Sequence, residues 1–483
     1  MSEAHPGKSV PSKRVLAGAV LLAVAFVLRV GLAVRYPAGV SIDEIFQTLE
    51  PAHRLAYGIG VTTWEWRLGV RSWIFPAFLA GIMRSTAWLA HGSAGYLMAI
   101  IVILSLASLS TVWFAYAWTR RVSSKEAAVL AACACAVSLL LVYMGSKALN
   151  EVVATDVLLP GLYLGVFPGT RHERIRLFYA GVLCGLAVSL RMQLIPAVAF
   201  ALLYFCYRHG GRRHIPALAA GFALPVLTFG MVDWITWSYP WQSVFLYYTA
   251  NIVQGRAAHF GVPHWYWYIE ALPILIGPVL LFVWQGARRS PFLALVSLIV
   301  FVSHTLVAHK ELRYLYPIIP LVITLAAIGF VDVAARLKPR FNLPEFSWVV
   351  VAFGTVCIFL SSLCALYYRP RLGDMGPSYA FDRLSRDPAP CGVALYRFGW
   401  FQSGGYTHLH RNVPLFWISS SDILAQRTAT YNAIVAPAQS SSLPPAFKQL
   451  QCSHGFCLYF RNGACQPPRR EDTLNGYLED SGN

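Results

Sequence analysis

The chain has 483 residues, of which 57% are hydrophobic and 13% are charged, and its formal net charge at pH 7 is +17. Because a soluble domain usually carries about a quarter charged residues, this composition excludes an ordinary soluble protein and predicts a polytopic membrane protein. The basic residues lie mostly in short segments between apolar runs, so they indicate membrane orientation and exclude nucleic acid as the partner of the positive charge.

Apolar segments near the ~20 residues that a bilayer requires recur along the chain. They lie at about 15–34, 94–118, 127–145, 152–168, 177–190, 194–207, 215–232, 269–285, 291–307, 314–331 and 347–368. The sequence therefore predicts an α-helical polytopic membrane protein with about eleven transmembrane helices. We expect a transmembrane domain over 1–368 and a small domain over 369–483.

Lysines and arginines mark one side of the membrane. They cluster before the first span and in alternate connections, among them Arg120, Arg121 and Lys125, Arg171, Arg174 and Arg176, and Arg288 and Arg289. That side is predicted to be cytoplasmic. The first outer loop, about 35–93, and the carboxy-terminal domain then face the periplasm of a bacterial inner membrane or the lumen of the endoplasmic reticulum.

The first outer loop is rich in functional side chains. Asp43 and Glu44 follow the first span directly, and Gln47 is expected to share a helix face with Glu44. Pro51 is expected to open a helix that Gly58 ends. Further candidates for a substrate pocket are His53, Trp64, Glu65 and Arg71. The alternative interpretation is an amphipathic surface helix with solvated carboxylates.

Three polar turns share this outer side. "SKALNE" carries Lys147, "SLRMQLIP" carries Arg191, and "AHKELRYLYP" carries His309, Lys310, Glu311 and Arg313. A charge at the bilayer centre costs about 2.5–3.5 kcal/mol, so these residues must lie at helix boundaries, in a polar cavity or opposite partners. Snorkelling to the headgroups is the alternative for each basic residue. The first outer loop offers carboxylates as partners.

The carboxy-terminal segment has the pattern of a minor α/β unit. Strands are predicted at 391–398, 412–418 and 431–437, a short helix at 443–451, and a hairpin turning at Asn462 and Gly463. Four cysteines favour two disulfides in an oxidising compartment, with the pairing open and four free thiols as the alternative; they are Cys391, Cys452, Cys457 and Cys465. His408 and His410 alternate as strand neighbours and are interpreted as surface or packing residues.

A cavity that holds carboxylates beside Arg, Lys and His, within apolar surroundings, suits transfer of a group from a lipid-linked phosphate. A carboxylate can take a proton from the acceptor hydroxyl. Cationic side chains can neutralise the charge that grows on the departing phosphate. The sequence thus favours an enzyme with a lipid-phosphate donor.

Two motifs resemble a known family. "DEIFQTLEPAHRLAYGIGVTTWEW", followed by "RSW", is similar to the first luminal loop of mannosyltransferases that use lipid-phosphate mannose, the group that includes GPI mannosyltransferases and the enzymes of N-glycan precursors. "HKELRY" resembles their "HKExRF" signature, with Tyr314 in place of Phe. The resemblance implies the GT-C fold, a polyprenyl- or dolichyl-phosphate mannose donor, a glycan or glycolipid acceptor, and inversion by a single displacement.

The resemblance also implies roles for residues. Asp43 is the expected general base, and Glu44 is a second candidate or an orienting group. His309, Lys310 and Arg313 are expected at the donor phosphate, with Lys147 and Arg191 as further donor-binding candidates. Glu311 would fix these cations or touch the sugar, and Trp64 and Glu65 would shape the pocket. Neither motif demands a metal or a cofactor.

Two alternatives stay open. One is a GT-C transferase of another sugar. The other is a transporter of lipid-linked glycans, which would place charges near the membrane midplane and often show repeated halves. The charges here cluster at one face, so transport is the weaker alternative.

Overall fold

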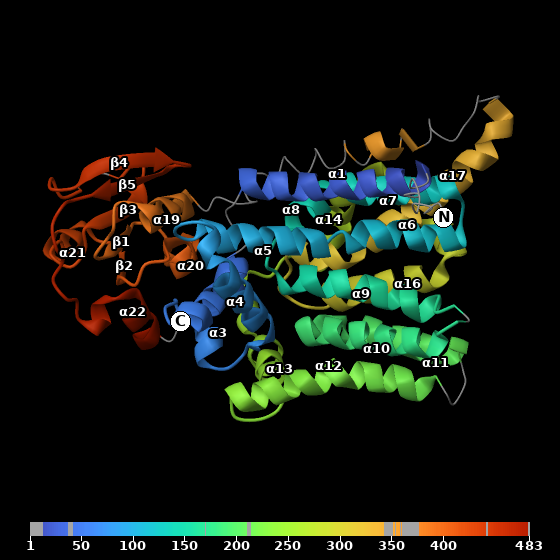
Figure 1. Ribbon diagram of the computed structural model, residues 1–483, viewed down its shortest axis with the longest axis horizontal. Helices are drawn as coiled ribbons and strands as arrows, with labels where there is room; N and C mark the ends of the chain where they lie inside the picture. The colour runs from blue at the N-terminus through green and yellow to red at the C-terminus, as the bar shows by residue number, and fades with distance from the viewer. Residues whose placement is uncertain are drawn as a thin grey trace, which may run out of the picture.

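The computed structural model describes residues 13–36, 42–169, 171–209, 214–341, 351–352, 354–357, 359, 376–440 and 443–481. Long helices lie side by side, and a small sheet lies at one end of them, next to the helices of the first outer loop (Figure 1). The expected span at 347–368 and the expected domain boundary after 368 fall largely outside the described residues.

The apolar runs of the sequence form the helices of the bundle. The structure places α1 at Lys13–Arg35, α5 at Ala94–Ala107, α6 at Ser110–Val122, α7 at Lys125–Val137, α8 at Leu139–Met144, α9 at Asn150–Val166, α10 at Glu173–Leu190, α11 at Ile195–His209, α12 at Ile215–Thr236, α14 at Trp267–Ile276, α15 at Val283–Arg289, α16 at Pro291–Thr305 and α17 at Ile319–Phe341.

Within the described part of the chain, five helical segments are long and apolar enough to cross a membrane. They are Leu16–Arg35, Ala94–Val122, Ile215–Thr236, Trp267–Arg289 and Leu312–Leu337. The protein is therefore a multi-pass membrane protein, and the count of eleven spans stays a prediction.

Glycines set the spacing of α10 and α12. A Cβ atom at Gly181 would lie 2.3 Å from the carbonyl oxygen of Leu218, and one at Gly221 would lie 2.0 Å from that of Phe178. Small residues let two backbones approach closely in a membrane, where packing replaces the hydrophobic driving force. Larger side chains at these positions would push the two helices apart.

The first outer loop folds into short helices. η1 spans Glu44–Leu49 with π-helical hydrogen bonding, α2 spans Glu50–Tyr57, α3 spans Trp64–Arg67 and α4 spans Ile74–Thr86. Pro51 lies in the first turn of α2, and Gly58 ends that helix with φ 79°, so both expectations are confirmed. Two later outer segments add α13 at Gln242–Tyr248, η4 at Thr249–Val253 and η5 at Arg256–Phe260, and η7 at Leu312–Ile318.

The carboxy-terminal unit contains a five-stranded sheet in the order β2-β1-β3-β5-β4. Its elements are α19 at Gly376–Arg386, β1 at Val393–Tyr396, α20 at Gly405–Leu409, β2 at Leu415–Ile418, α21 at Ser421–Gln426, β3 at Ala433–Pro437, β4 at Lys448–Ser453, β5 at Phe456–Phe460 and α22 at Leu474–Asp480. β1 pairs in parallel with β2 and β3, and β5 pairs antiparallel with β3 and β4. The three predicted strands are confirmed.

Two local predictions in this unit are wrong. The second half of the expected helix at 443–451 belongs to strand β4. The expected hairpin does not turn at Asn462 and Gly463 but joins β4 to β5. The turn is made by His454 and Gly455, whose φ angles of 50° and 78° are what a tight two-residue hairpin turn requires. Residues 448–451 form a strand because their pairing with β5 outweighs their local preference for a helix. Tertiary context often overrides such preferences.

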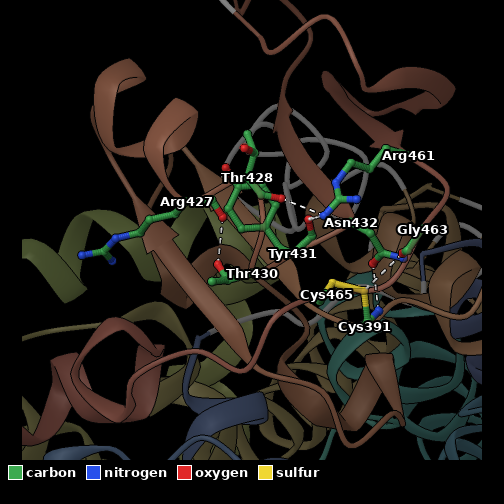
Figure 2. The surroundings of a disulfide bond; sticks show 9 residues. All are labelled: Cys391, Arg427, Thr428, Thr430, Tyr431, Asn432, Arg461, Gly463 and Cys465. Carbon is green, nitrogen blue, oxygen red and sulfur yellow. Dashed lines mark hydrogen bonds between the residues drawn. A yellow bond between two sulfur atoms is a disulfide. The ribbon is translucent and has the colours of Figure 1, made fainter.

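The four cysteines form the two disulfides that the sequence favours. Cys391 is bonded to Cys465, and Cys452 is bonded to Cys457 across the β4–β5 hairpin. Figure 2 shows the surroundings of the first bond, where the side chain of Asn432 accepts a hydrogen bond of 2.8 Å from the backbone N–H of Cys391. The longer link joins residues that lie 74 positions apart and ties both ends of the sheet unit together.

Candidate functional site

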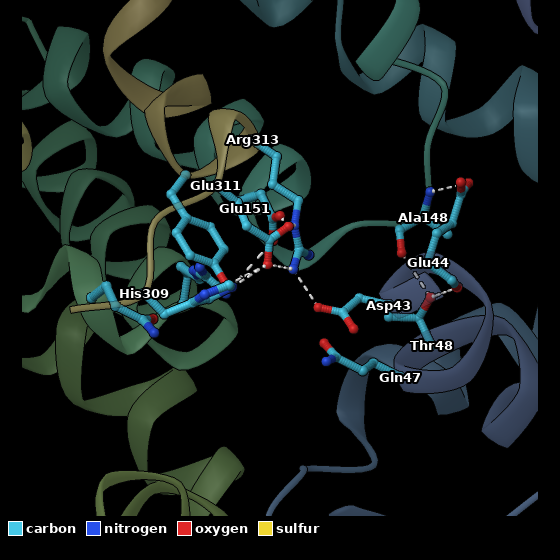
Figure 3. Close-up of polar contacts among 12 residues, drawn as sticks. Asp43, Glu44, Gln47, Thr48, Ala148, Glu151, His309, Glu311 and Arg313 are labelled. Atoms are coloured by element: carbon cyan, nitrogen blue, oxygen red, sulfur yellow. Dashed lines mark hydrogen bonds and ion pairs between the residues drawn. The ribbon is translucent and has the colours of Figure 1, made fainter. Parts of the chain in front are cut away.

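Asp43 and Arg313 meet at the centre of the candidate site. Asp43 is the residue that directly precedes η1, and Arg313 lies in η7. The Nη2 group of Arg313 donates to the Asp43 carboxylate, its Nη1 donates to Glu151 at 3.0 Å, and its Nε donates to Glu311 at 2.7 Å (Figure 3). One guanidinium, 5% exposed, thus holds three carboxylates that come from three different parts of the chain.

Glu311 is the most heavily bonded of these carboxylates. In addition to Arg313, it accepts from the Tyr314 hydroxyl at 2.9 Å, and its oxygen lies 3.1 Å from Nε2 of His309. Burial alone would raise the pKa of Glu311, but the charge and hydrogen bonds of Arg313, with those of His309 and Tyr314, hold this pKa well below its ordinary value. The hydrogen bond to Glu311 raises the pKa of His309. Glu311 is therefore a firmly ionised anchor for its neighbours.

Arg191 extends the cluster beyond Glu151. Its Nη1 lies 3.7 Å from the second oxygen of Glu151, and its guanidinium lies over the Tyr314 ring at 4.7 Å. The residue is 7% exposed, and within the described structure its buried Nε has no hydrogen-bond partner. An orphan donor on a buried cation is costly, so this atom is suited to receive an anionic group.

A second group of polar side chains comes from the first outer loop. Arg71 donates two hydrogen bonds to one oxygen of Glu65, at 2.7 and 3.2 Å, and the Gln47 amide donates to the same oxygen at 3.4 Å. Burial would lower the pKa of Arg71, but the Glu65 carboxylate outweighs it and raises this pKa. The guanidinium therefore stays charged, and it also lies over the Tyr247 ring at 5.1 Å.

A cleft lies between Arg191 and the pair Arg71 and Gln47. Its polar lining includes Gln47, Arg71, Asn150, Arg191 and Gln193, and its apolar lining includes Ile74, Phe75, Pro76, Leu190, Met192, Phe229 and Val244. Two arginines in apolar walls are a chemical match for an amphiphilic anion such as a lipid phosphate.

Glu44 turns away from this cleft. Its carboxylate accepts a hydrogen bond of 3.1 Å from the backbone N–H of Ala148, on the opposite side of η1 from Asp43 and Gln47 (Figure 3). The expectation that Glu44 and Gln47 share a helix face is wrong, because η1 is a π-helix, whose i→i+5 bonds widen the turn. Glu44 instead lines a second cavity, of about 510 Å³.

The two lysines of the sequence prediction lie apart from the carboxylates around Arg313. The Lys310 ammonium donates to the carbonyls of Val307 and Ala308, at 2.9 and 3.4 Å, in the turn that follows α16. These backbone contacts hold the ammonium within its own turn. Lys147 donates to the carbonyl of Tyr36 at 3.4 Å and lines the second cavity, which it shares with Asp382 and His408.

His53 and Trp64 also lie outside the Arg313 cluster. The Nδ1 atom of His53 donates to the carbonyl of Ile59 at 2.8 Å, so its Nε2 accepts from Nδ1 of His410 at 3.0 Å. Burial lowers the pKa of His53 to about 4, which keeps the ring neutral. Trp64 is covered by the guanidinium of Arg256 at 5.0 Å.

The predicted strand pattern of the carboxy-terminal histidines is wrong. His408 lies in helix α20, and His410 ends that helix with φ 46°. His408 is nearly buried and pairs with Asp382 at 2.9 Å. The interpretation of both as packing residues agrees with their contacts at the boundary between the sheet unit and the first outer loop.

Sequence reasoning gave no role to Glu151, although the polar turn before α9 contains it. Its signal was an acidic side chain at the start of a mostly apolar helix, and in the structure it is 1% exposed. A buried carboxylate needs cationic partners or several hydrogen-bond donors, and Arg313 and Arg191 are the cations that Glu151 meets.

Comparison with known proteins shows the family of the chain. A family model described as the Alg9-like mannosyltransferase family matches residues 20–372. The chain is 25% identical over 419 residues to GPI mannosyltransferase 3 of Yarrowia lipolytica, which covers 83% of this chain and 76% of that protein. It is 26% identical over 328 residues to GPI alpha-1,2-mannosyltransferase 3 of Mus musculus, which covers 65% of this chain and 59% of the mouse protein.

Solved structures share the fold. The crystal structure of ArnT from Cupriavidus metallidurans bound to undecaprenyl phosphate matches with a TM-score of 0.60 and 12% identity, covering 94% of this chain and 99% of that one. The apo form of the same protein matches with a TM-score of 0.58. The predicted GT-C fold with a small carboxy-terminal sheet unit is thereby confirmed.

Proposed function

The chain belongs to the Alg9-like mannosyltransferase family, and we propose that it transfers mannose from a polyprenyl- or dolichyl-phosphate mannose donor to a glycan or glycolipid acceptor. One observation carries this proposal: Arg191 and Arg71 line a cleft with apolar walls, and Arg191 is linked to the Arg313 cluster by its ion pair with Glu151. Such a cleft suits the phosphate and the first isoprene units of the donor.

Asp43 is the general base of the proposed reaction. A base must touch the acceptor, and the Asp43 side chain is 28% exposed, whereas that of Glu151 is 1% exposed. Glu311 is accessible too, at 32%, but its low pKa makes it a poor proton acceptor. Glu44 accepts from Ala148 on the other side of η1, which suits an orienting role.

The step is a single displacement at the sugar carbon. An acceptor hydroxyl gives its proton to Asp43, and its oxygen forms a bond to the anomeric carbon from the face opposite the phosphate. The bond from this carbon to the phosphate oxygen breaks, and the lipid phosphate leaves with the electron pair. Attack from the opposite face inverts the configuration.

Arg191 and Arg71 are the proposed partners of the leaving phosphate. The bonded groups of Arg313 serve three carboxylates, so we assign Arg313 to holding Asp43 and the polar turns in place. Arg191 brings a buried Nε that can take a new hydrogen bond. Charge-assisted hydrogen bonds from guanidinium groups to phosphate are strong and can be bidentate.

The acceptor and the membrane side are part of the proposal. Relatives named GPI mannosyltransferase 3 make a GPI-type glycolipid precursor the first acceptor to test. The distribution of Lys and Arg supports a site on the non-cytoplasmic face, in the endoplasmic reticulum or a bacterial inner membrane.

The donor class is tested with purified protein in detergent. Radiolabelled polyprenyl-phosphate mannose, polyprenyl-phosphate arabinose and nucleotide-linked mannose are each offered with candidate glycolipid acceptors. We expect label transfer from polyprenyl-phosphate mannose alone. Transfer from the nucleotide-linked sugar in the absence of lipid phosphate would contradict the proposal, and a stronger reaction with lipid-phosphate arabinose than with mannose would favour the alternative sugar.

A further inference from the structure

The segment that carries Asp43 is buried in the core of the carboxy-terminal unit. Ile45 and Phe46, which lie two and three residues after Asp43, belong to the same apolar cluster as Leu395 of the sheet and Leu409 of α20. Phe46 is 2% exposed and meets the Trp400 ring edge-on, with 5.0 Å between the ring centroids. The placement of the proposed base therefore depends on residues more than three hundred positions away.

Glu50 forms the polar part of this connection. Its side chain is fully buried, and it accepts four hydrogen bonds: from the backbone N–H of Val61 at 2.8 Å, from that of Tyr406 at 2.8 Å, from that of Thr407 at 2.9 Å, and from the Thr407 hydroxyl at 2.7 Å. Three of the four donors belong to α20, so a carboxylate of the first outer loop organises the backbone of the carboxy-terminal unit. Leaving such donors unpaired in a buried place is costly.

The backbone of α20 approaches Glu50 so closely that residue 405 must be glycine. A Cβ atom at Gly405 would lie 2.6 Å from the Glu50 carboxylate. The residue also has φ +58°, a conformation that glycine adopts without strain. The fold thus reserves space for the carboxylate.

Further contacts surround this joint, by which we mean the contact of Glu50 with residues 405–407 of α20. The Tyr96 hydroxyl donates to the carbonyl of Thr407, and His410 donates to His53 at 3.0 Å. Asn475 of α22 donates to the carbonyl of Gly60 at 3.2 Å and accepts from the N–H of Thr62 at 3.2 Å. The two units therefore meet through directed polar contacts as well as through a shared apolar core.

One short helix connects the joint to the proposed base. Asp43 is the residue before η1 and Glu50 is the residue after it. We propose that Glu50 is a positioning residue: by anchoring the far end of η1 to α20, it fixes the place of Asp43 against Arg313. This inference rests on the proposed function, and it gives the carboxy-terminal unit a role in turnover that does not require it to touch the donor.

Three substitutions disturb the joint between Glu50 and α20 to different degrees. Glu50→Gln keeps the shape of the side chain but turns an amide NH₂ toward backbone donors. Gly405→Ala inserts a methyl group against the carboxylate, and Thr407→Val removes one hydrogen bond. The matched control is Gly455→Ala, because Gly455 also has positive φ, +78°, yet a Cβ there meets nothing within 4 Å.

Turnover and donor affinity are measured separately. We expect Glu50→Gln and Gly405→Ala to lower kcat by about 10-fold to 100-fold, as small misplacements of a catalytic group do, with the KM for the lipid-phosphate donor within about 2-fold of the wild type because Arg71 and Arg191 are untouched. Thr407→Val should lower kcat by a few-fold, and Gly455→Ala should leave it unchanged. Equal kcat in Gly405→Ala and Gly455→Ala, or an effect on donor KM alone, would overturn the proposal.

Hydrogen exchange of the amides of residues 44–49 separates this inference from the proposed function. Glu50→Gln and Gly405→Ala should exchange faster there than Gly455→Ala. This readout needs no activity, so it decides on the joint even if the wild type transfers no mannose, a result that would end the proposed function alone. Unchanged exchange in both joint variants would refute the positioning role. If Glu50→Gln does not fold, the kcat of Thr407→Val and its hydrogen exchange at residues 44–49 decide in its place.

Discussion

Asp43 and Arg313 are separated by 270 positions in the chain, and their side chains form an ion pair at the start of η1. The same guanidinium binds Glu151 and Glu311. Three outer segments of the bundle are thus joined at one buried cation, which lies beside a cleft with two further arginines. The geometry of such a site depends on each of the charged residues that form it.

Replacement of Arg313 should affect both stability and turnover. Arg313→Met leaves Asp43, Glu151 and Glu311 close together without a cation, and breaking a buried charge cluster of this kind costs about 3–5 kcal/mol. We expect the free energy of unfolding in mild detergent to fall by that amount. Arg313→Lys keeps the charge but lacks the fork that bridges several carboxylates, so it should fold and lose most of its turnover. Unchanged stability of Arg313→Met would contradict the structural role of the cluster.

Donor affinity should depend on the arginines of the cleft. Arg191→Gln and Arg71→Gln each remove a charged donor from the proposed phosphate site, and a hydrogen bond to a charged group contributes about 1.5–3 kcal/mol. We expect the Kd of the purified protein for polyprenyl phosphate to rise by about 10-fold to 150-fold.

Lys310→Gln is the informative counterpart of these two variants. The Lys310 ammonium donates to carbonyls of the turn that follows α16, so its replacement should change the Kd for polyprenyl phosphate by less than about 3-fold. A larger loss of affinity for polyprenyl phosphate in Lys310→Gln than in Arg191→Gln would indicate that the phosphate binds at the "HKELR" turn instead.

The boundary between the two units should respond to pH through His408. Burial alone would lower the pKa of His408, but Asp382 outweighs it and raises this pKa above its ordinary value of 6.5. A raised pKa in the folded state means that the ion pair contributes stability fully below pH 6.5 and loses it as the pH rises through the raised value. The Tm in detergent should therefore fall across that interval.

Asp382→Asn should remove the fall in Tm above pH 6.5. The amide oxygen can still accept the hydrogen bond from His408, but the main charge that raises the pKa is gone, and burial, which lowers the pKa, then outweighs the remaining charges of Glu44 and Glu50. Asp422→Asn, in the exposed first turn of α21, serves as the control and should keep the wild-type profile of Tm against pH. Identical profiles for Asp382→Asn and the wild type would show that another group titrates.

The sequence was sufficient to predict the architecture and the meeting of two motifs. The apolar runs define the helices, because no other residues could face lipid, and the carboxylates at 43 and 44 and the cations at 309–313 were too costly to bury alone. Their pairing follows from charge and from the shared outer side. The family resemblance of both motifs pointed to the same fold.

The choice among neighbouring residues could not be read from the sequence. Arg313, and not Lys310, faces Asp43 because the Lys310 ammonium is bonded to carbonyls of the turn that follows α16. Glu44 faces away from Gln47 because η1 is a π-helix, a rare form whose occurrence depends on tertiary contacts. Glu50 gave no signal at all, since its partners in α20 lie more than 350 positions away.

Turnover of Asp43→Asn tests the central claim most directly. Purified wild type and Asp43→Asn are compared for mannose transfer from the lipid-phosphate donor and for binding of polyprenyl phosphate. Loss of the carboxylate should lower kcat by about 100-fold to 10,000-fold, the range for a general base, while the Kd for polyprenyl phosphate changes little because the arginines of the cleft remain. Near wild-type kcat in Asp43→Asn would contradict the account.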